Sequence, residues 1–389
     1  MYKNIDNIKL KIESGLNMNE RSANGKKLNK VKSRRKGKAT INDVANLAGV
    51  VPSTVSHVIN GTATITPETT QKVMAAIEKL NYSPNALARA LRQKETGLIG
   101  VVLQDISSEF YAKCAASILE EARKDNYVVL LCDASFNNEN VREGVEALVE
   151  RRVDGLIFIG GGDDESIIQR AIFANVPVVL GDRQMGGLPS VEYDNAASVK
   201  KMVCALYETG YRRFAYVGEP VSVQSNLASR YRGYIDGLYS CGIGEEDSLV
   251  ILDERLHRFK LESAYELFEE HFGAMEKKAV PEVILTSNDM IAQGIMSAAK
   301  RMGFQVPGDI AVVGFDDISI SKYFEPALTT IVQDEKMLGK TCYQTLMSIV
   351  KDKSKVVHEV LPQKIKIRQS AVIRPEILAK YQDDVFKEK

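Results

Sequence analysis

Residues 39–60 read ATINDVANLAGVVPSTVSHVIN, and this stretch decides the fold of the N-terminal part of the chain. Thr40 can cap a first helix, and Asp43 then stands in its first turn, where a negative charge complements the helix dipole. Apolar residues recur at intervals of three and four until Gly49 interrupts them. A second helix should begin near Pro52, a residue suited to the first helical position. Two helices joined by a short turn around a glycine predict a helix-turn-helix unit.

A third helix is expected to follow the first two. Thr66 and Pro67 supply a cap and a first helical residue. Val73 and Ile77 recur at helical spacing and would lie on its buried face. Residues 39–82 are therefore predicted to form a small all-helical domain.

Residues 83–96 are predicted to be a hinge and linker. Within them, residues 85–92 can form about two helical turns, and so short a helix is marginal alone in water. We expect this helix to form only when something packs on it.

The basic residues of the chain are concentrated near its N-terminus. Lys plus Arg and Asp plus Glu both number 51, so the formal net charge is zero. Residues 1–92 nevertheless hold 16 Lys or Arg against 6 Asp or Glu, which leaves an acidic remainder. This asymmetry favours a nucleic-acid-binding domain on a separate body. Residues 1–38 are expected to be a basic, disordered extension; a translation start placed too far upstream and an arm that adds phosphate contacts are the alternatives.

Length, composition and cysteine pattern exclude several classes of protein. A chain of 389 residues suits about two to three domains, and 44% apolar with 26% charged residues is ordinary for globular proteins. Five cysteines without a CxxC pair indicate free thiols in a reducing cytoplasm and no metal framework. No apolar run approaches a membrane span and no signal peptide is visible, so we expect a cytoplasmic protein with no membrane partner.

Residues 97–389 alternate between apolar strand-like runs and amphipathic helical segments. Strands are expected at residues 98–103, 127–132, 155–159, 176–180, 213–218, 283–286, 310–314 and 328–332. Helices are expected between most of them, for example at residues 109–124, 289–302 and 336–350. Buried strands that alternate with helices predict parallel sheets. Because the region is large for one sheet, we expect two doubly wound α/β lobes, and the segment after Pro326 can cross back between them.

Polar side chains follow many of these strands. They are Gln104-Asp105, Asp133, Asp182-Arg183, Asn288-Asp289 and Asp316-Asp317. Ligands of open parallel sheets bind beyond the carboxyl ends of the strands. Carboxylates and amides gathered there suit the hydroxyls of a sugar or polyol. The alternative for each residue is that it only caps the following helix.

No set of catalytic residues can be assembled from motifs. The turn after the first expected strand reads Asp-Ile-Ser-Ser rather than GxGxxG, and the chain contains neither GxxxxGK[ST] nor GxSxG. The four histidines form neither HExxH nor HxH. The sequence therefore predicts a binding protein rather than an enzyme, with no metal and no cofactor.

Several segments resemble one known family, in the same order along the chain. Residues 39–60 strongly resemble the DNA-binding domain of the lac repressor family of bacterial regulators, and YSPNALARAL (residues 82–91) looks like its hinge helix. The segments VDGLIFIG (153–160), TSNDMIAQG (286–294), VVGFDD (312–317) and LTTIVQ (328–333) match its effector domain. The resemblance begins after residue 38. It implies an all-α DNA-binding domain and a two-lobed α/β body (residues 97–389) like a periplasmic sugar-binding protein, which acts as a homodimer on a pseudo-palindromic operator.

The resemblance also implies which residues bind DNA. The second helix would enter the major groove, with Ser53 and His57 at base edges and Thr54 and Ser56 nearer to phosphates. The family usually has Ser at the position of Val51, which can neither cap the helix nor bind a phosphate. The full DNA-binding set outside the hinge is Thr40, Pro52, Ser53, Thr54, Ser56, His57, Asn60 and Tyr82.

In the hinge, Leu91 matches the leucine that the family inserts into the minor groove at the operator centre. Two symmetry-related wedges of this kind kink the DNA. Asn85, Ala88 and Arg89 would lie along the groove. The alternative is that Leu91 packs on the first lobe.

For the effector, Arg230 matches the arginine that binds effectors across the family, and Asn288 and Asp316 match its sugar ligands. Phe259 stands where members carry an aromatic residue that stacks on the effector. Each aromatic residue can instead belong only to the core. The full effector-binding set is Asp105, Phe110, Tyr111, Asp182, Arg230, Phe259, Asn288 and Asp316.

The expected function is a DNA-binding transcriptional regulator, a repressor switched by a small polar metabolite. A sugar or sugar derivative is favoured, although Arg230 also suits a phosphate or carboxylate and Phe259 a nucleobase. Inducer and corepressor action both stay open. The alternative within the family is a global carbon regulator driven by a phosphorylated carrier protein. A solute-binding protein would need a signal peptide and no DNA-binding domain, and the short segment after Pro375 favours a dimer over a tetramer.

Overall fold

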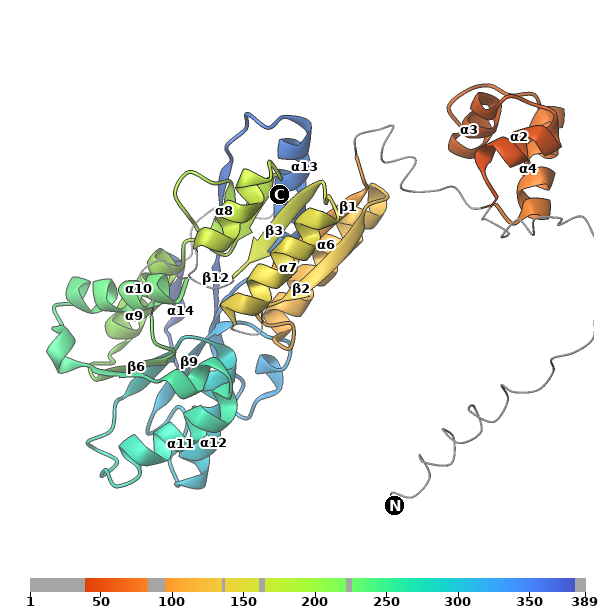
Figure 1. Cartoon of the computed structure of the whole chain (residues 1–389). Coiled ribbons are helices and arrows are strands. Elements are labelled where there is room, and N and C mark those ends of the chain that lie inside the picture. Colours follow the sequence, from red (N-terminus) through yellow and green to blue (C-terminus); the bar gives the residue numbers. More distant parts are fainter. Residues whose placement is uncertain (1–38, 83–94, 135–136, 161–164, 222–225, 382–389) are drawn as a thin grey trace, which may run out of the picture. The chain divides into compact units, whose positions relative to one another are not determined.

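The computed structural model describes residues 39–82, 95–134, 137–160, 165–221 and 226–381. These residues form two compact units that divide near residue 85, and each is described by itself (Figure 1). The expected extension at residues 1–38 and the expected hinge helix lie outside the described residues. None of the described helices is long and apolar enough to cross a membrane.

The described residues 39–82 of the N-terminal unit, called the head, form three helices as predicted. They are α2 (Ile41–Ala48), α3 (Pro52–Asn60) and α4 (Pro67–Leu80). Thr40 caps α2 in a capping box, because Asp43 N donates to its hydroxyl and its own N–H donates to the Asp43 carboxylate. The cap of α3 is Val51, which offers no side-chain hydrogen bond. The helices meet on a small core of Val44, Ala45, Val55, Val73 and Ala76.

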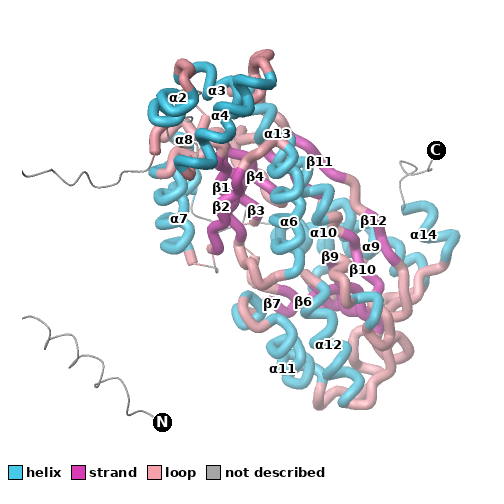
Figure 2. The backbone as a smooth tube through the Cα atoms, turned by 90° about the vertical axis from the view of Figure 1, so that its right-hand side faces the viewer, coloured by secondary structure: helices cyan, strands magenta, loops and turns pink. Residues whose placement is uncertain are grey.

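The first lobe of the C-terminal unit, the body, is a six-stranded sheet covered by helices on both faces. Its strands are β1 (Leu98–Leu103), β2 (Val128–Asp133), β3 (Gly155–Ile159), β4 (Val178–Gly181), β5 (Ser190–Tyr193) and β11 (His358–Leu361), in the order β11-β5-β4-β3-β1-β2. Neighbouring strands are parallel. Helices α6 (Glu109–Lys124) and α13 (Glu335–Lys351) lie side by side on one face, and α7 (Asn138–Glu150) and α8 (Glu165–Phe173) cover the other (Figure 2).

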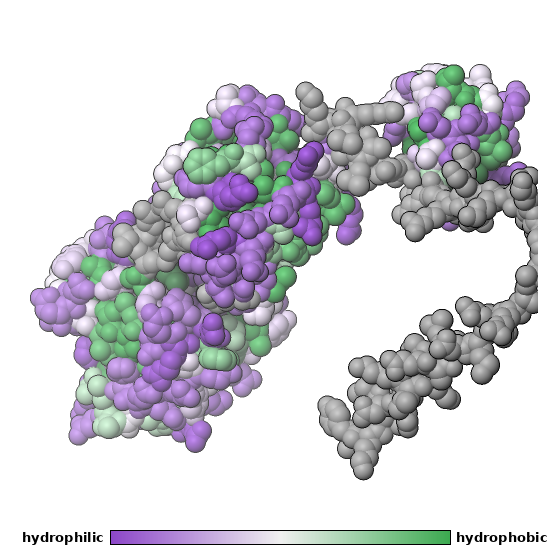
Figure 3. Space-filling model, in the orientation of Figure 1, coloured by the Kyte–Doolittle hydropathy of each residue, from purple (hydrophilic) through white to green (hydrophobic). Residues whose placement is uncertain are grey.

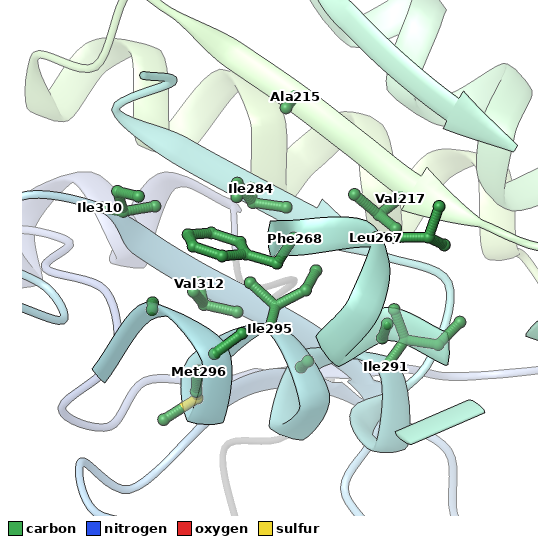
Figure 4. Close-up of a cluster of buried hydrophobic side chains, with 14 of the residues drawn as sticks. Ala215, Val217, Leu267, Phe268, Ile284, Ile291, Ile295, Met296, Ile310 and Val312 are labelled. Carbon is green, nitrogen blue, oxygen red and sulfur yellow. The ribbon is translucent and has the colours of Figure 1, made fainter. Parts of the chain in front are cut away.

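The second lobe repeats this architecture. Its strands are β6 (Phe214–Gly218), β7 (Leu249–Leu252), β8 (Val283–Thr286), β9 (Ala311–Asp316), β10 (Thr329–Val332) and β12 (Lys364–Lys366), in the order β12-β10-β9-β8-β6-β7, with only β12 antiparallel. Helices α9 (Asn195–Thr209), α10 (Asn226–Ser240) and α14 (Pro375–Tyr381) cover one face, and α11 (Lys260–Phe272) and α12 (Asp289–Arg301) the other. Phe268 of α11 and Ile295 of α12 point toward Ile284 and Val312 of the sheet (Figure 4).

The chain passes between the two lobes three times. It leaves the first lobe between β5 and α9, returns between β10 and α13, and leaves again between β11 and β12. The expectation that the segment after Pro326 crosses back is therefore confirmed. Three short crossings thus connect the lobes, and short connections of this kind can let two lobes change their mutual orientation without unfolding.

Candidate functional site

A cavity of about 400 Å³ lies between the lobes, beyond the carboxyl ends of β1, β4, β6, β8 and β9. Its volume falls in the range of small-molecule sites. Seven of the eight expected effector-binding residues line it: Asp105, Phe110, Tyr111, Asp182, Arg230, Asn288 and Asp316. The fold thus brings together strand-end residues that are far apart in the sequence.

Arg230 of α10 lies in this cavity and is only 4% exposed. Its Nη1 donates to the carbonyl oxygen of Ser287, and its Nη2 lies 3.5 Å from Asp316 Oδ1. The guanidinium stacks on the ring of Phe315 at 3.8 Å. Its Nε atom is buried without a hydrogen-bond partner among the described residues. A rigid, partly neutralised guanidinium therefore keeps one donor for a ligand.

Asp182, at the end of β4 in the first lobe, is 1% exposed. Its Oδ2 accepts a hydrogen bond from Asn226 of the second lobe, whereas its Oδ1 has no partner among the described residues. Burial raises the pKa of Asp182 to about 6, although the nearby Arg230 opposes this shift. Asp182 and Asn226 also line a second polar cavity of about 320 Å³.

Two of the cavity carboxylates occupy unusual backbone conformations. The φ angle is 55° at Asp182 and 114° at Asp316, a region that residues other than glycine rarely adopt. Such conformations cluster at functional sites, where the surrounding structure holds them in place. The same region of φ is also occupied by Asp317, which has a structural role, so the backbone conformation alone does not distinguish binding from capping.

Glu219 is a site residue that the sequence analysis missed. It directly follows β6, lines the cavity and is 3% exposed. Its carboxylate accepts hydrogen bonds from the Ser287 hydroxyl and from Asn288 Nδ2, and pairs with Lys260 Nζ at 3.1 Å. Burial favours the neutral form, but Lys260 and Ser287 hold the pKa of Glu219 below its ordinary value. Its place directly after an apolar strand is the signal that could have identified it.

Asn288 has both ends of its amide engaged within the protein. Its Oδ1 caps α12 by accepting from Ile291 N at 3.0 Å, and its Nδ2 donates to Glu219 at 3.1 Å. Both the capping role and the place in the cavity that the sequence suggested are therefore present. Glu219 fixes the orientation of the amide, so any ligand meets a preset Nδ2 group.

The first lobe supplies an aromatic wall. The Tyr111 hydroxyl donates to Gln104 Oε1 at 3.0 Å, and the rings of Phe110 and Tyr111 meet edge to face. Phe110 is also a member of the core of the first lobe, so both of its alternative roles apply. Asp105 accepts from the backbone and hydroxyl of Ser107, which makes it a turn cap as well as a lining residue.

Phe259 is not among the described residues that line the cavity. It precedes α11 and is 64% exposed, although its neighbours Arg258 and Lys260 do line the cavity. The expectation that Phe259 stacks on a ligand is therefore not met by this conformation. The physical reason is local, because Phe259 occupies the cap position of α11 and its side chain faces away.

Three other strand-end carboxylates have structural roles. Asp289 is fully buried and accepts from Ile318 N, the Ser321 hydroxyl and the Thr330 hydroxyl. Asp133 accepts from the Ile106 N–H, and Asp317 forms ion pairs with Lys366 and Arg368. None of these three residues caps the following helix, because Asn137 caps α7 and Asn288 caps α12; their carboxylates instead hold neighbouring loops and strands.

Hydrogen bonds join the lobes on both sides of the cavity. On one side Asn226 donates to Asp182. On the other, Ser319 N donates to Glu109 Oε1 at 2.7 Å, and Lys113 Nζ donates to the Ser319 hydroxyl at 2.9 Å. A ligand in the cavity would therefore act on contacts that set the relation of the two lobes.

In the head, α3 exposes the residues that were expected to contact DNA. Pro52, Ser53 and His57 are exposed, and Thr54 and Ser56 are partly exposed. His57 Nδ1 lies 2.9 Å from the Thr62 hydroxyl, which leaves Nε2 as the ring nitrogen available to a base.

The remaining expected DNA contacts flank α3 or fall beyond the described residues. Thr40 is the exposed cap of α2, Asn60 bonds Ser56 at 3.2 Å, and Tyr82 packs against the core of the head. Asn85, Ala88, Arg89 and Leu91 lie outside the described residues. Among the residues that the structure describes, no group of three or more His, Cys, Asp or Glu is arranged to hold a metal ion.

Comparison with known families gives two matches. Residues 40–85 match the model of bacterial regulatory proteins of the lacI family, and residues 203–371 match that of a periplasmic binding protein-like domain. The catabolite control protein A of Priestia megaterium is 32% identical over 85% of this chain and 98% of its own length. The HTH-type transcriptional repressor PurR of Photobacterium profundum is 32% identical over the same shares of the two chains.

Solved structures agree with these matches. The lac repressor dimer bound to operator and the anti-inducer ONPF superposes with a TM-score of 0.74 at 28% identity, over 86% of this chain and 99% of that one. The complex of the transcriptional regulator CelR with cellobiose superposes with a TM-score of 0.64 at 25% identity, over 86% and 100%. These similar proteins are regulators of transcription rather than enzymes.

Proposed function

Because the chain belongs to the lacI family of bacterial regulatory proteins, we propose that it represses transcription as an operator-bound homodimer under the control of a small uncharged polyol. Like its relatives, it is a DNA-binding regulator and not an enzyme. As a DNA-binding protein it acts in the cytoplasm. The parts that we assign are a basic extension (1–38), a DNA-binding domain (39–82), a hinge (83–96) and an effector-binding and dimerisation body (97–389).

The DNA interface that we propose is the exposed face of α3. Ser53 and His57 Nε2 can bond base edges in the major groove, and Thr54 and Ser56 are placed for phosphates or for the helix itself. Pro52, Asn60, Thr40 and Tyr82 flank this face. The hinge contacts of Asn85, Ala88, Arg89 and Leu91 are carried over from the family resemblance alone.

The observation that carries the effector proposal is the pair of unpartnered atoms in the cavity. Asp182 Oδ1 is an acceptor and Arg230 Nε is a donor, and both are buried. A buried polar group without a partner costs free energy, so a ligand that completes both atoms gains affinity. A hydroxyl group can donate to the first and accept from the second. A molecule with several hydroxyls, such as a sugar, fits this requirement. The similar regulator CelR was solved in complex with cellobiose.

The charge of the cavity favours an uncharged sugar over a sugar phosphate or an organic acid. Its described lining residues include the carboxylates of Asp105, Glu109, Asp182, Glu219, Glu262 and Asp316, against the cations of Arg230, Arg258 and Lys260. Lys260 is balanced by Glu219, and Arg230 lies 3.5 Å from Asp316, although burial raises the pKa of Asp316 well above its ordinary value. A further negative charge would therefore be repelled. A nucleobase is disfavoured because Phe259 does not line the cavity.

A protein partner is the second candidate for the controlling signal. The similarity to catabolite control protein A supports it, because this relative aligns over 98% of its length. In this alternative a phosphorylated carrier protein replaces the small molecule. A pull-down of the purified chain with phosphorylated and unphosphorylated carrier discriminates the two cases: retention of the phosphorylated form alone supports the partner.

The homodimer is supported by apolar surface on both lobes. On the first lobe, the edge strand β2 exposes Val128 and Leu131. On the second, Met290, Ile320 and Tyr323 are exposed around a groove of about 500 Å³. Hydrophobic areas reach the surface of both lobes between hydrophilic ones (Figure 3). Large exposed apolar areas mark interaction sites, and we propose that a second copy covers them. The similar lac repressor was solved as a dimer.

Sedimentation tests the dimer. Wild type should sediment with the mass of two chains, and Tyr323→Asp should shift the equilibrium toward one chain because a charge would be buried at the interface. A matched control is Tyr239→Asp, since Tyr239 is similarly exposed but lies on α10. A wild-type mass of one chain or of four would overturn the proposal.

The function as a whole is tested by titrating the full-length protein onto duplex DNA from its own upstream region at fixed salt. Uncharged sugars, sugar phosphates and nucleobases are added in turn. His57→Ala or Leu91→Ala should weaken DNA binding without changing the affinity for an effector. Unchanged DNA affinity in both variants would refute the interface, and an effect of sugar phosphates alone would refute the uncharged effector.

A further inference from the structure

Helices α9 and α10 of the second lobe approach each other very closely. Gly233 and Gly237, four residues apart on one face of α10, stand at the contact. A Cβ atom on Gly233 would lie 2.3 Å from the carbonyl oxygen of Ala196, and one on Gly237 would lie 2.7 Å from Val203 Cβ. Only glycine fits at these two positions, so the packing distance between the helices is set by their backbones.

This close approach brings two thiols into contact. Cys241 continues the row of Gly233 and Gly237 one turn further, just after the end of α10, and Cys204 follows Val203 on α9. Their sulfur atoms are 3.8 Å apart. A disulfide has an S–S distance of about 2.05 Å, so its formation would bring the two sulfur atoms closer than they are here.

The other cysteines differ from this pair. Cys114 and Cys342 are fully buried. Cys132 is partly exposed, as Cys204 and Cys241 are, but its sulfur lies against the carbonyl oxygen of Asn140. The pair therefore combines partial exposure with a second thiol in reach, and Cys132 serves as the matched control.

We propose that Cys204 and Cys241 form an oxidation site at which a hydroperoxide converts the two thiols into a disulfide that ties α9 to α10. The thiolate of Cys204 attacks the peroxide, the O–O bond breaks, an alcohol or water leaves, and a sulfenic acid remains on Cys204. The sulfur of Cys241 then attacks that sulfur, the S–O bond breaks, and the hydroxyl leaves as water with the proton of Cys241. Two thiols thus supply the two electrons that reduce one hydroperoxide.

The order of the two thiols follows from their surroundings. Burial, together with the neighbouring Cys204, raises the pKa of Cys241 to about 12. The direction of this shift favours Cys204 as the first nucleophile and Cys241 as the resolving thiol. Because the attacking species is a thiolate, the bond should form faster at pH 8.5 than at pH 7.

The disulfide would restrain the chain of the second lobe. It would close a loop between residues 37 positions apart, which restricts the unfolded chain and raises the temperature of unfolding by several degrees. The proposal requires neither the effector nor DNA, and it stands or falls independently of the proposed function.

Peptide mapping of the full-length protein tests the site. The protein is treated with hydrogen peroxide, blocked with N-ethylmaleimide and digested with trypsin without reduction. The expected product joins the peptides of residues 202–212 and 233–255, with the mass of both minus two hydrogen atoms. It should disappear on treatment with a reductant and be absent from Cys204→Ser and Cys241→Ser, while Cys132→Ser retains it.

The thermal readout is independent of the mapping. Peroxide should raise the unfolding temperature of the wild type and of Cys132→Ser, reversibly on reduction, and leave the two serine variants unchanged. The proposal is overturned if both thiols remain free to react with N-ethylmaleimide, if each is oxidised alone, or if the crosslink joins two different chains.

Discussion

The effector proposal depends on two side-chain atoms, Arg230 Nε and Asp182 Oδ1, and each residue allows a direct test. For Arg230→Lys we expect effector affinity to fall about 10- to 100-fold, since hydrogen bonds from a charged group contribute about 1.5–3 kcal/mol and lysine lacks the Nε donor and the planar fork. Isothermal titration with the effector identified in the DNA assay measures this. Arg232→Lys is the control, because Arg232 is exposed on the same helix and does not line the main cavity. Equal loss in both variants would contradict the role of Arg230.

The raised pKa of Asp182 predicts a pH dependence of stability. The pKa is near 3.9 in an unfolded chain and about 6 in the folded protein. Between these values the folded state binds more protons, so this residue lowers the free energy of unfolding as the pH rises from 4 to 6. Asp182→Asn removes the effect. The free energy of unfolding of the variant, relative to that of the wild type, should therefore rise by about 3 kcal/mol between pH 4 and pH 7. Urea unfolding measures this difference.

Above pH 7 the same difference should stay constant, because the carboxyl is then ionised in both states. Glu139→Gln is a suitable control, since Glu139 is exposed at the start of α7. A difference for Asp182→Asn that does not change with pH would show that Asp182 has an ordinary pKa in the folded protein.

At the residue scale, the sequence predicted seven of the residues that line the cavity. Polar residues after parallel strands converge because the carboxyl ends share one edge, and this rule together with the family resemblance led to Asp182, Asn288 and Asp316. The rule could not distinguish Asp289 from the residues that line the cavity. The Asp289 carboxylate accepts three hydrogen bonds from within the protein. The rule also could not give the direction of Phe259, which depends on how α11 begins.

Among the elements, helix α3 lacks a side-chain hydrogen bond at its N-terminal cap. Val51 has the extended conformation of a cap residue but no side-chain acceptor. Val51→Ser should stabilise the helix by about 1 kcal/mol. In full-length protein, hydrogen exchange of residues 52–60 should slow about fivefold, as measured by mass spectrometry.

The control for this helix is Val51→Ala, which shortens the exposed side chain without adding an acceptor. It should leave the exchange rate close to that of the wild type. Equal slowing by serine and alanine would mean that loss of valine, rather than a new cap, stabilises the helix.

The contact between α9 and α10 predicts that replacing a helical glycine by alanine destabilises the protein. Glycine to alanine within a helix normally stabilises by about 1 kcal/mol. Gly233→Ala should instead destabilise by about 1–3 kcal/mol, because the new methyl group would meet the backbone of α9. Thermal unfolding of Gly186→Ala is the comparison, since a Cβ there meets nothing within 4 Å. A stabilised Gly233→Ala would show that the helices are further apart.

The sequence predicted most strands of the body but missed two of the short ones. The expected ranges of β1, β3, β8 and α6 match the structure residue for residue. Strands β5 and β7 were not expected, although each has four residues, as the expected strand β8 does. These short strands are held by their neighbours in the sheet, which a local reading of the sequence does not contain.

For the whole molecule, the two lobes of the body and the crossings between them position the cavity. Each lobe contributes to the cavity, and hydrogen bonds between the lobes flank it on both sides. A ligand that prefers one relation of the lobes shifts the protein toward that relation by its difference in affinity. The sequence predicted two lobes and a returning C-terminal segment, but the pairing of β11 with β5 and of β12 with β10 follows only from the three-dimensional structure.

The central claim is that this chain reads a specific two-fold symmetric DNA sequence. Selection of bound duplexes from a random DNA library by the full-length protein tests it most directly, because the selection needs neither the operator nor the effector to be identified beforehand. We expect enrichment of one pseudo-palindromic sequence with two half-sites, which His57→Ala should fail to enrich to the same extent. Recovery of unenriched DNA, or of a single half-site without symmetry, would contradict the account.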